Sequence, residues 1–175
     1  MRSRPHCSSA MSLFRPKEIL DRYDDFDMKS YYDKGYRTIF LDIDNTIAIP
    51  NTGKCDDNAR RFIEELKDMG YEVLIFSNNT YMRVRSFAEP IECRWQCWSM
   101  KPLPFGFWIA AVKLKVKPSK VVALGDQLLT DILGANLSGC YGIYCKQLQE
   151  KDSPLTKMNR RIEKLIWRYI LHEEM

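Results

Sequence analysis

Two carboxylates lie two positions apart in the segment "FLDIDNTI", at the end of an apolar run: Asp42 and Asp44. Alternate residues of a β-strand point to the same side, so both carboxylates would face one way if the strand continued through them. Like charges this close repel unless a cation lies between them. Mg²⁺ prefers oxygen ligands of this kind, so the spacing predicts metal-assisted chemistry here.

Further polar residues follow other apolar segments of the chain. Ser77 and Asn78 come directly after "VLIF", Lys101 follows "CRWQCW", and Asp126 follows "VVALG" with Asp131 five residues later. A hydroxyl, helix-start N–H groups and an ammonium are suited to binding phosphate, while Asp126 adds a carboxylate for a cation. Together these residues predict a site that binds a phosphate group beside a metal.

Segments with strand-like and helix-like patterns alternate along the chain. We expect a helix over 17–36, strands over 37–43, 71–76, 94–98, 121–125 and 141–145, and helices over 56–69, 80–88, 104–116 and 128–137. This alternation predicts an α/β fold of three layers, with a central parallel sheet and helices on both faces. Ligands bind such sheets at the carboxyl ends of the strands, where the polar residues described above lie.

The chain of 175 residues, 45% of them hydrophobic, has the length and composition of one globular domain. We predict a flexible tail over 1–13 and a single domain over 14–175. The net charge of +4 permits an anionic partner without requiring one, and we expect no nucleic-acid partner. No apolar stretch reaches the roughly 20 residues of a membrane span, and no secretion signal is recognisable, so we expect a cytoplasmic location. The oligomeric state does not follow from the sequence.

Four sequence motifs, taken in order, resemble those of the haloacid dehalogenase (HAD) phosphatase superfamily: "DIDNT", the serine of "FSNN", the lysine of "MKP", and "GDQLLTD". Each motif alone also fits an ordinary structural role, such as a turn, a helix cap or a surface charge. Their order and their placement at expected strand ends make the joint match specific. The resemblance implies a Rossmann-like HAD fold and phosphatase activity.

The resemblance also implies a role for each acidic residue. Asp42 would be the nucleophile that forms an aspartyl-phosphate, and Asp44 would protonate the leaving oxygen and then deprotonate the attacking water. Mg²⁺ would be held by the Asp42 side chain, the Asp44 backbone carbonyl and Asp126. Asp131 would orient the water molecules around the metal without binding it directly.

The remaining motif residues would act on the phosphate and on the loop. By the same resemblance Lys101 would offset charge between the nucleophile and the phosphate, and Ser77, with Asn78, would bind the substrate. Thr46 would orient the loop that carries Asp44.

Members of this superfamily differ in inserted cap domains, and the segments 46–56 and 79–101 are too short to hold one. We therefore expect an open site. The span 14–169 resembles most closely the YqeG-like branch of subfamily IIIA, which includes phosphatidylglycerophosphate phosphatases and implies that lipid as the first substrate. Two alternatives stay open: a phosphatase of a soluble nucleotide, sugar phosphate or nucleic-acid end, and a non-catalytic adaptor, against which the presence of Asp44 argues.

The segment 157–171 is expected to form a basic amphipathic helix. One face carries Met158, Ile162, Leu165, Ile166 and Tyr169, and Arg160, Arg161, Lys164 and Arg168 lie away from it. This apolar face either packs on the domain or lies on an anionic membrane surface, which would make the protein peripheral to a membrane. An aromatic run around Lys101 has the same two interpretations, core packing or an apolar rim to an open site: Trp95, Trp98, Phe105, Phe107 and Trp108.

Overall fold

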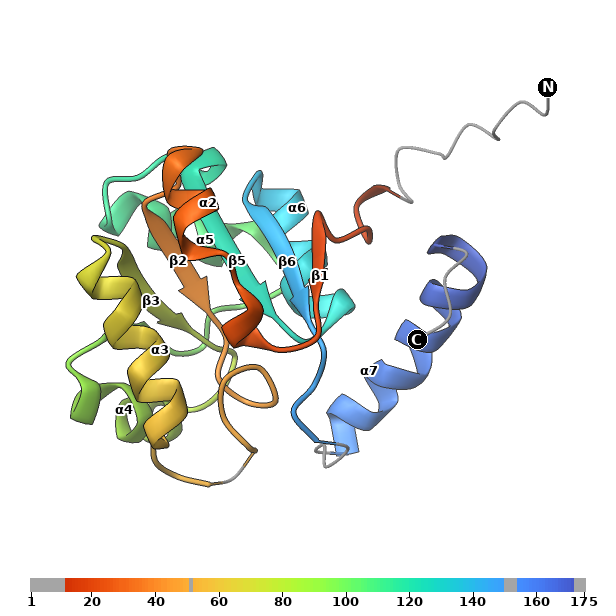
Figure 1. Cartoon of the computed structure of the whole chain (residues 1–175). Helices are drawn as coiled ribbons and strands as arrows, with labels where there is room; N and C mark the ends of the chain where they lie inside the picture. The colour runs from red at the N-terminus through yellow and green to blue at the C-terminus, as the bar shows by residue number, and fades with distance from the viewer. Residues whose placement is uncertain (1–11, 51, 150–153, 172–175) are drawn as a thin grey trace.

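A parallel six-stranded sheet organises the molecule (Figure 1), whose computed structural model describes residues 12–50, 52–149 and 154–171. Its order is β1-β6-β5-β2-β3-β4. The strands are β1 (Glu18–Leu20), β2 (Thr38–Leu41), β3 (Glu72–Phe76), β4 (Arg94–Gln96), β5 (Val121–Gly125) and β6 (Tyr141–Cys145). All residues of β2 and β5 are buried, as expected of strands covered on both faces.

Helices cover both faces of the sheet and give the three predicted layers. Side chains of β2 alternate: Ile39 and Leu41 join a core that includes Phe62 of α3 (Asp57–Asp68), while Phe40 packs on the opposite face in a cluster with Phe107 of α5 (Pro104–Lys113). Figure 1 shows α3 in front of the sheet and α5 behind it. The predicted α/β fold without a large cap domain is confirmed.

Of the other helices, α7 (Pro154–Leu165) is as long as α3 and the rest are shorter. They are α2 (Met28–Asp33), α4 (Tyr81–Ala88), α6 (Leu133–Ser138) and α7, with single turns of 3₁₀ helix at η1 (Tyr23–Asp25), η2 (Glu89–Ile91) and η3 (Pro118–Lys120), and π-helical segments at η4 (Leu128–Ile132) and η5 (Ile166–Leu171). The helix expected over 128–137 therefore starts as a π-helical segment. Thr80 is the N-cap of α4, and its hydroxyl accepts the Arg83 N–H.

The helix predicted over 17–36 is wrong for its first half. Strand β1 lies there and pairs in parallel with β6, with Glu18 opposite Ile143. Backbone bonds extend this pairing, since the Lys17 N–H donates to the Gly142 carbonyl at 2.9 Å and the Lys146 N–H to the Leu20 carbonyl at 2.9 Å. A strand this short is fixed by bonds to a distant segment, which local sequence periodicity does not report.

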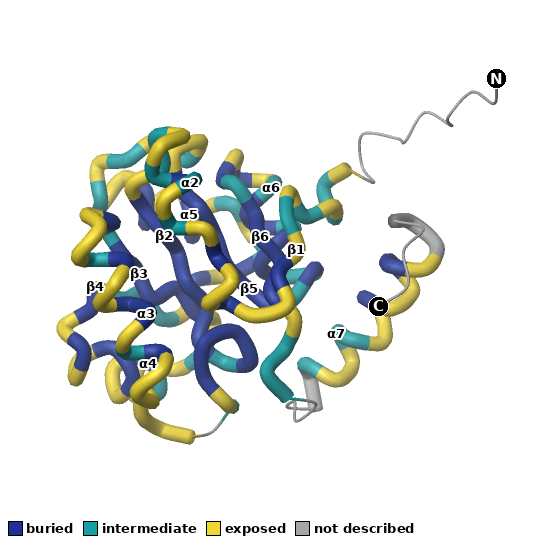
Figure 2. The backbone as a smooth tube through the Cα atoms, viewed as in Figure 1, coloured by how far each residue is buried: buried dark blue, intermediate teal, exposed yellow. Residues whose placement is uncertain are grey.

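The C-terminal helix packs on the domain through Ile166 of the apolar face expected from the sequence, but Met158, Ile162 and Leu165 of that face stay exposed. Ile166 and Trp167 are buried in a cluster with Leu128, Ile132 and Tyr144, whereas Met158, Ile162 and Leu165 are 54%, 43% and 57% exposed. Figure 2 shows α7 mostly exposed beside the buried strands. Tyr169 has no described side chain, and residues 1–11 of the predicted tail lie outside the described residues.

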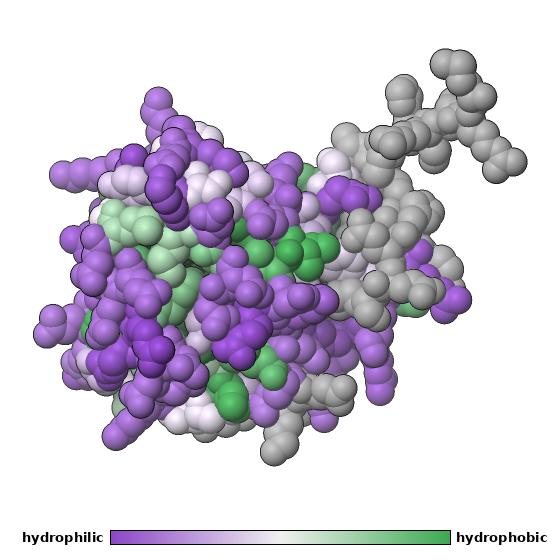
Figure 3. All heavy atoms as spheres, viewed as in Figure 1, coloured by the Kyte–Doolittle hydropathy of each residue, from purple (hydrophilic) through white to green (hydrophobic). Residues whose placement is uncertain are grey.

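Polar side chains dominate the face of the molecule drawn in Figure 3, with apolar side chains in small separate patches. Within residues 12–50, 52–149 and 154–171, no helix combines the length and the apolar character needed to cross a membrane.

Candidate active site

Asp42 lies directly after β2, at the carboxyl edge of the sheet. Its N–H donates to the Leu124 carbonyl of β5 at 3.0 Å, which extends the sheet pairing by one residue and fixes the direction of its side chain. The chain then turns away through Asn45, whose φ of 63° lies in the left-handed region that Asn tolerates better than most residues. The turn leaves Asp42 buried at the centre of the site.

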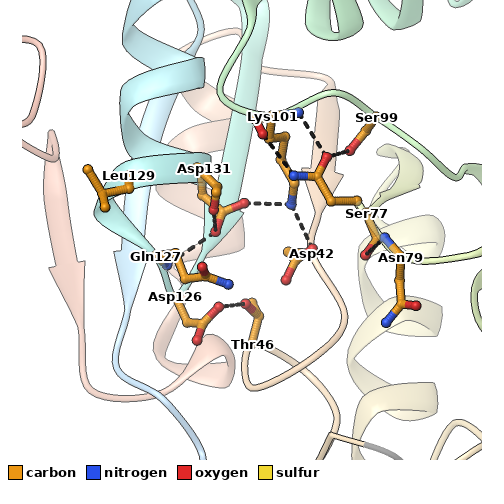
Figure 4. Close-up of polar contacts among 12 residues, drawn as sticks. Asp42, Thr46, Ser77, Asn79, Ser99, Lys101, Asp126, Gln127, Leu129 and Asp131 are labelled. Atoms are coloured by element: carbon orange, nitrogen blue, oxygen red, sulfur yellow. Dashed lines mark hydrogen bonds and ion pairs between the residues drawn. The ribbon is translucent and has the colours of Figure 1, made fainter. Parts of the chain in front are cut away.

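Lys101 lies between two carboxylates (Figure 4). Its ammonium is 2.7 Å from Asp42 Oδ1 and 2.6 Å from Asp131 Oδ1, and all three side chains are buried. Burial raises the pKa of Asp42 to about 6 although Lys101 lowers it. Burial by itself lowers the pKa of Lys101, but Asp131 and Asp42 together raise it above its usual value, so Lys101 remains a cation.

Asn78 holds the loop that carries Lys101. Its Oδ1 accepts the Lys101 N–H at 2.8 Å and the Ser99 hydroxyl at 3.0 Å, and its Nδ2 donates to the Lys101 carbonyl at 2.8 Å. The sequence assigned Asn78 to substrate binding, but both atoms of its amide are engaged by this loop. These bonds tie Asn78 to the loop of Lys101, and its predicted contact with substrate stays a prediction.

Asp126 and Asp131 come from the segment after β5, which folds tightly against the strand end. A Cβ atom on Gly125 would lie 2.2 Å from the Asp131 Cγ, so only glycine allows Asp131 to approach this closely. The Gln127 N–H donates to Asp131 Oδ2 at 3.1 Å. Thr46, expected to orient the Asp44 loop, donates its hydroxyl to Asp126 Oδ1 at 3.3 Å and so ties that loop to Asp126.

Three buried acids form a group that fits a divalent cation: Asp42, Asp126 and Asp131 each offer an oxygen within 4.8 Å of the others. Burial raises the pKa of Asp126 well above its usual value, with Arg160 opposing the rise. Removing three carboxylates from water is unfavourable unless cations compensate, and oxygen-only donors suit a hard ion such as Mg²⁺. The resemblance gives Asp131 the role of orienting metal-bound water without binding the metal. In the structure its carboxylate oxygen lies as close to the other two acids as they lie to each other, within 4.8 Å. The predicted contribution of the Asp44 carbonyl stays a prediction.

Asp44 lies in a different environment from Asp42. Its Oδ1 is 2.8 Å from Arg83 Nη2, and its Oδ2 accepts from Asn79 Nδ2 at 2.9 Å. The Asp44 side chain is 23% exposed, so it can reach a substrate from outside. Sequence reasoning missed Arg83, although its position in the first turn of α4, which starts after β3 at the site edge, is a signal that could have found it.

Ser77 is buried at the end of β3, where its Oγ accepts the Asn79 N–H at 3.2 Å. This places its hydroxyl beside the turn formed by Asn78 and Asn79. Its contact with a phosphoryl oxygen stays a prediction.

A third basic residue at the site, after Lys101 and Arg83, comes from far along the chain. Arg160 of α7 forms an ion pair with the Asp126 carboxylate, donates to the Asp126 carbonyl, and lies 3.1 Å from Glu163 Oε2. No motif distinguishes Arg160 from the other basic residues of that helix, so sequence reasoning had no reason to choose it.

Comparisons with known proteins find similarity to hydrolases and phosphatases. A family model described as haloacid dehalogenase-like hydrolase matches residues 17–139. The chain is 30% identical over 154 residues to the "Probable phosphatase YqeG" of Bacillus subtilis, covering 88% of this chain and 90% of that protein. It is 37% identical over 51 residues to the mitochondrial phosphatidylglycerophosphatase GEP4 of Saccharomyces cerevisiae, covering 29% of this chain and 28% of that one. The cobalt-bound deoxy-D-mannose-octulosonate 8-phosphate phosphatase of Haemophilus influenzae superposes with a TM-score of 0.51 at 10% identity, covering 77% of this chain and 89% of that one.

Proposed function

Since the chain belongs to the haloacid dehalogenase-like hydrolase family and is a phosphatase of that type, we propose that it is a Mg²⁺-dependent phosphomonoesterase acting on phosphatidylglycerophosphate through an aspartyl-phosphate. One observation carries the mechanism: Lys101 lies between Asp42 and Asp131, within a group of three buried acids that fits a cation. This arrangement supports the proposal, because a carboxylate, an ammonium and a group of acids that fits a cation lie together at the sheet edge.

In the first step an Asp42 oxygen attacks the phosphorus, a new O–P bond forms, and the bond from phosphorus to the ester oxygen breaks. The electron pair of that bond leaves with the oxygen, which takes a proton from Asp44. Lys101 stabilises the negative charge shared by the nucleophile and the phosphoryl group. After Asp44 has given up this proton, Arg83 and Asn79 hold its carboxylate at the edge of the site until the second step.

In the second step Asp44 takes a proton from a water molecule, whose oxygen attacks the phosphorus and releases Asp42 and inorganic phosphate. A bound Mg²⁺ would supply charge neutralisation for the phosphoryl oxygens, held by Asp42 and Asp126 with Asp131 close to both. Ser77 would bind a phosphoryl oxygen from the end of β3.

An apolar rim beside Lys101 favours a substrate presented by a membrane. The residues from 98 to 101 alternate, with Trp98 62% and Met100 45% exposed, whereas Ser99 and Lys101 are buried. We call the exposed residues of this loop and the start of α5 the apolar rim: Trp98, Met100, Leu103 and Phe105. The predicted aromatic run is therefore divided, because Phe107 belongs to the core and Trp98 and Phe105 to the surface.

The outer side of α7 offers a second apolar surface with positive charge beside it. Met158, Ile162 and Leu165 are exposed, and so are the basic residues Lys157, Arg161, Lys164 and Arg168. Each basic residue near an anionic lipid surface contributes about 1 kcal/mol to attraction. These features support peripheral contact with a membrane that carries the anionic substrate, and the match to the yeast phosphatidylglycerophosphatase agrees with it.

The test is phosphate release from phosphatidylglycerophosphate in anionic liposomes, with Mg²⁺ and with EDTA, beside a panel of soluble monoesters. We expect release that requires Mg²⁺ and is lost in D42N. The double variant W98A/F105A should lose activity on liposomes while retaining activity on soluble esters. V112A, which shortens an exposed apolar side chain near the far end of α5, is the matched control.

Release confined to soluble esters would retain the mechanism and refute the lipid substrate. Absence of Mg²⁺-dependent release from every monoester, generic ones included, would refute the mechanism as well.

A further inference from the structure

Arg160 is bound to Asp126 as closely as Lys101 is bound to Asp42. One nitrogen of its guanidinium pairs with Asp126 Oδ2 and the other donates to the Asp126 carbonyl. The Arg160 side chain is 12% exposed and that of Asp126 is fully buried. The Arg160 guanidinium is therefore largely buried and bonds to both the side chain and the backbone of Asp126. This differs from a surface charge surrounded by water.

Glu163, one helical turn further along α7, reinforces this contact. It is 1% exposed; its Oε2 lies 3.1 Å from Arg160 Nη1, and its Oε1 accepts the Leu129 N–H at 3.0 Å. The Leu129 N–H belongs to the first turn of η4, whose backbone donors have no partner within that helix. Arg160 and Glu163 thus hold Asp126 and the start of η4 from the same side.

Apolar packing holds α7 and η5 in place at their other end. Trp167 packs edge-on against Tyr144, with ring centroids 5.4 Å apart, and is buried with Leu128 and Ile132 of η4. The segment 126–131 is therefore held by polar contacts at one end of the C-terminal helix and by apolar contacts at the other. This segment carries two of the three acids that could bind a cation, Asp126 and Asp131.

The two oxygens of Asp126 have separate partners, Arg160 at Oδ2 and Thr46 at Oδ1. A carboxylate oxygen accepts two bonds, so each oxygen retains a position for a cation. Two partners on different oxygens also fix the plane of the carboxylate. Arg160 thus forms an ion pair with Asp126, as Lys101 does with Asp42 and Asp131. Every acid of the group therefore has a basic partner.

We propose that Arg160, supported by Glu163, is a positioning residue of the metal site, and that the C-terminal helix is a clamp that fixes the segment 126–131 for cation binding. This inference rests on the proposed metal-dependent function. Partners that orient metal ligands typically account for 10- to 100-fold in metal affinity.

The experiment compares full-length wild type, R160A, R160K and E163Q in binding of Mn²⁺ alone, followed by the electron paramagnetic resonance signal of the free ion. We expect R160A to weaken binding by about 10- to 100-fold, and R160K and E163Q to weaken it less. Excess Mg²⁺ should recover much of the R160A rate. R161A, which changes the exposed neighbouring arginine, should bind Mn²⁺ as wild type does.

Circular dichroism shows whether each variant is folded, and R160K and E163Q serve as the test if R160A is not. Equal Mn²⁺ affinity in wild type and the Arg160 variants would overturn the inference. Tighter binding by R160A would also overturn it, since Arg160 would then compete with the cation. Failure of wild type to bind Mn²⁺ would refute the proposed metal dependence itself, whereas binding lost in D126N but unchanged in the Arg160 variants would refute only the clamp.

Discussion

Replacing Lys101 with methionine removes the ammonium between Asp42 and Asp131 and keeps a side chain of similar length. In wild type that ammonium lies 2.7 Å from one carboxylate and 2.6 Å from the other, and 4% of the Lys101 side chain is exposed. K101M therefore leaves two buried carboxylates without the cation that they share.

Removing one partner of a buried ion pair costs about 3–5 kcal/mol in the free energy of unfolding. Protonation limits this cost, and Asp42 is the group that will take up a proton. Its pKa is already raised to about 6 by burial, against the lowering effect of Lys101, so it rises further in K101M. A carboxyl with a raised pKa in the folded state stabilises that state less as the pH rises. The destabilisation should therefore be small near pH 5 and approach its full size above pH 7.

The measurement is urea unfolding of wild type and K101M in EDTA from pH 5 to pH 8, with the same series in Mg²⁺. We expect the difference between the two proteins to grow with pH and to become smaller in Mg²⁺, because a divalent cation offsets the same carboxylates. K113M, which replaces an exposed lysine of α5, is the control. A loss of less than about 1 kcal/mol at pH 8, or one independent of pH, would refute the assignment of Lys101 as the shared buried cation.

Three further variants test other parts of the site. Between pH 3.8 and about 6, metal-free wild type should lose up to about 3 kcal/mol of stability through Asp42, because its carboxyl releases its proton less readily when folded than when unfolded. D42N should lack that slope in urea unfolding in EDTA, and equal slopes would contradict the raised pKa. R83A should lower kcat about tenfold by releasing the Asp44 carboxylate, whereas R85A, which removes an exposed pair with Glu89, should not; equal effects would contradict the role of Arg83. G125A should cost about 1–3 kcal/mol in thermal unfolding and weaken Mn²⁺ binding, since its Cβ would overlap Asp131; unchanged values would contradict the close approach.

The strands that position the site could be read from the sequence. The predicted segments 121–125 and 141–145 coincide with β5 and β6. Central parallel strands are buried on both faces, so they appear as continuous apolar runs that a short sequence window detects. Once those ends are known, the carboxyl edge of the sheet brings Asp42, Lys101 and Asp126 together without further information.

Contacts between distant segments could not be predicted in the same way. Strand β1 depends on bonds to β6, and Arg160 reaches Asp126 across 34 positions of the chain. The amphipathic pattern of the C-terminal helix grouped Met158, Ile162 and Leu165 with Ile166 on one face, either to pack on the domain or to lie on a membrane. The structure buries Ile166 with Glu163 and Trp167 and leaves the other three exposed. A buried carboxylate at Asp126 requires a basic partner, and that requirement is invisible in the helix pattern alone.

The two carboxylates of "DIDNT" occupy separate environments. In a continued strand both would face the same side of the sheet. Strand β2 ends at Leu41, and Asp44 instead forms an isolated bridge with Ala48. The side chain of Asp42 is 8% exposed beside Lys101, whereas that of Asp44 is 23% exposed beside Arg83. A single cation therefore need not compensate both charges. The turn separates a buried carboxylate, suited to attack phosphorus, from a more accessible one, suited to exchange protons with substrate and water.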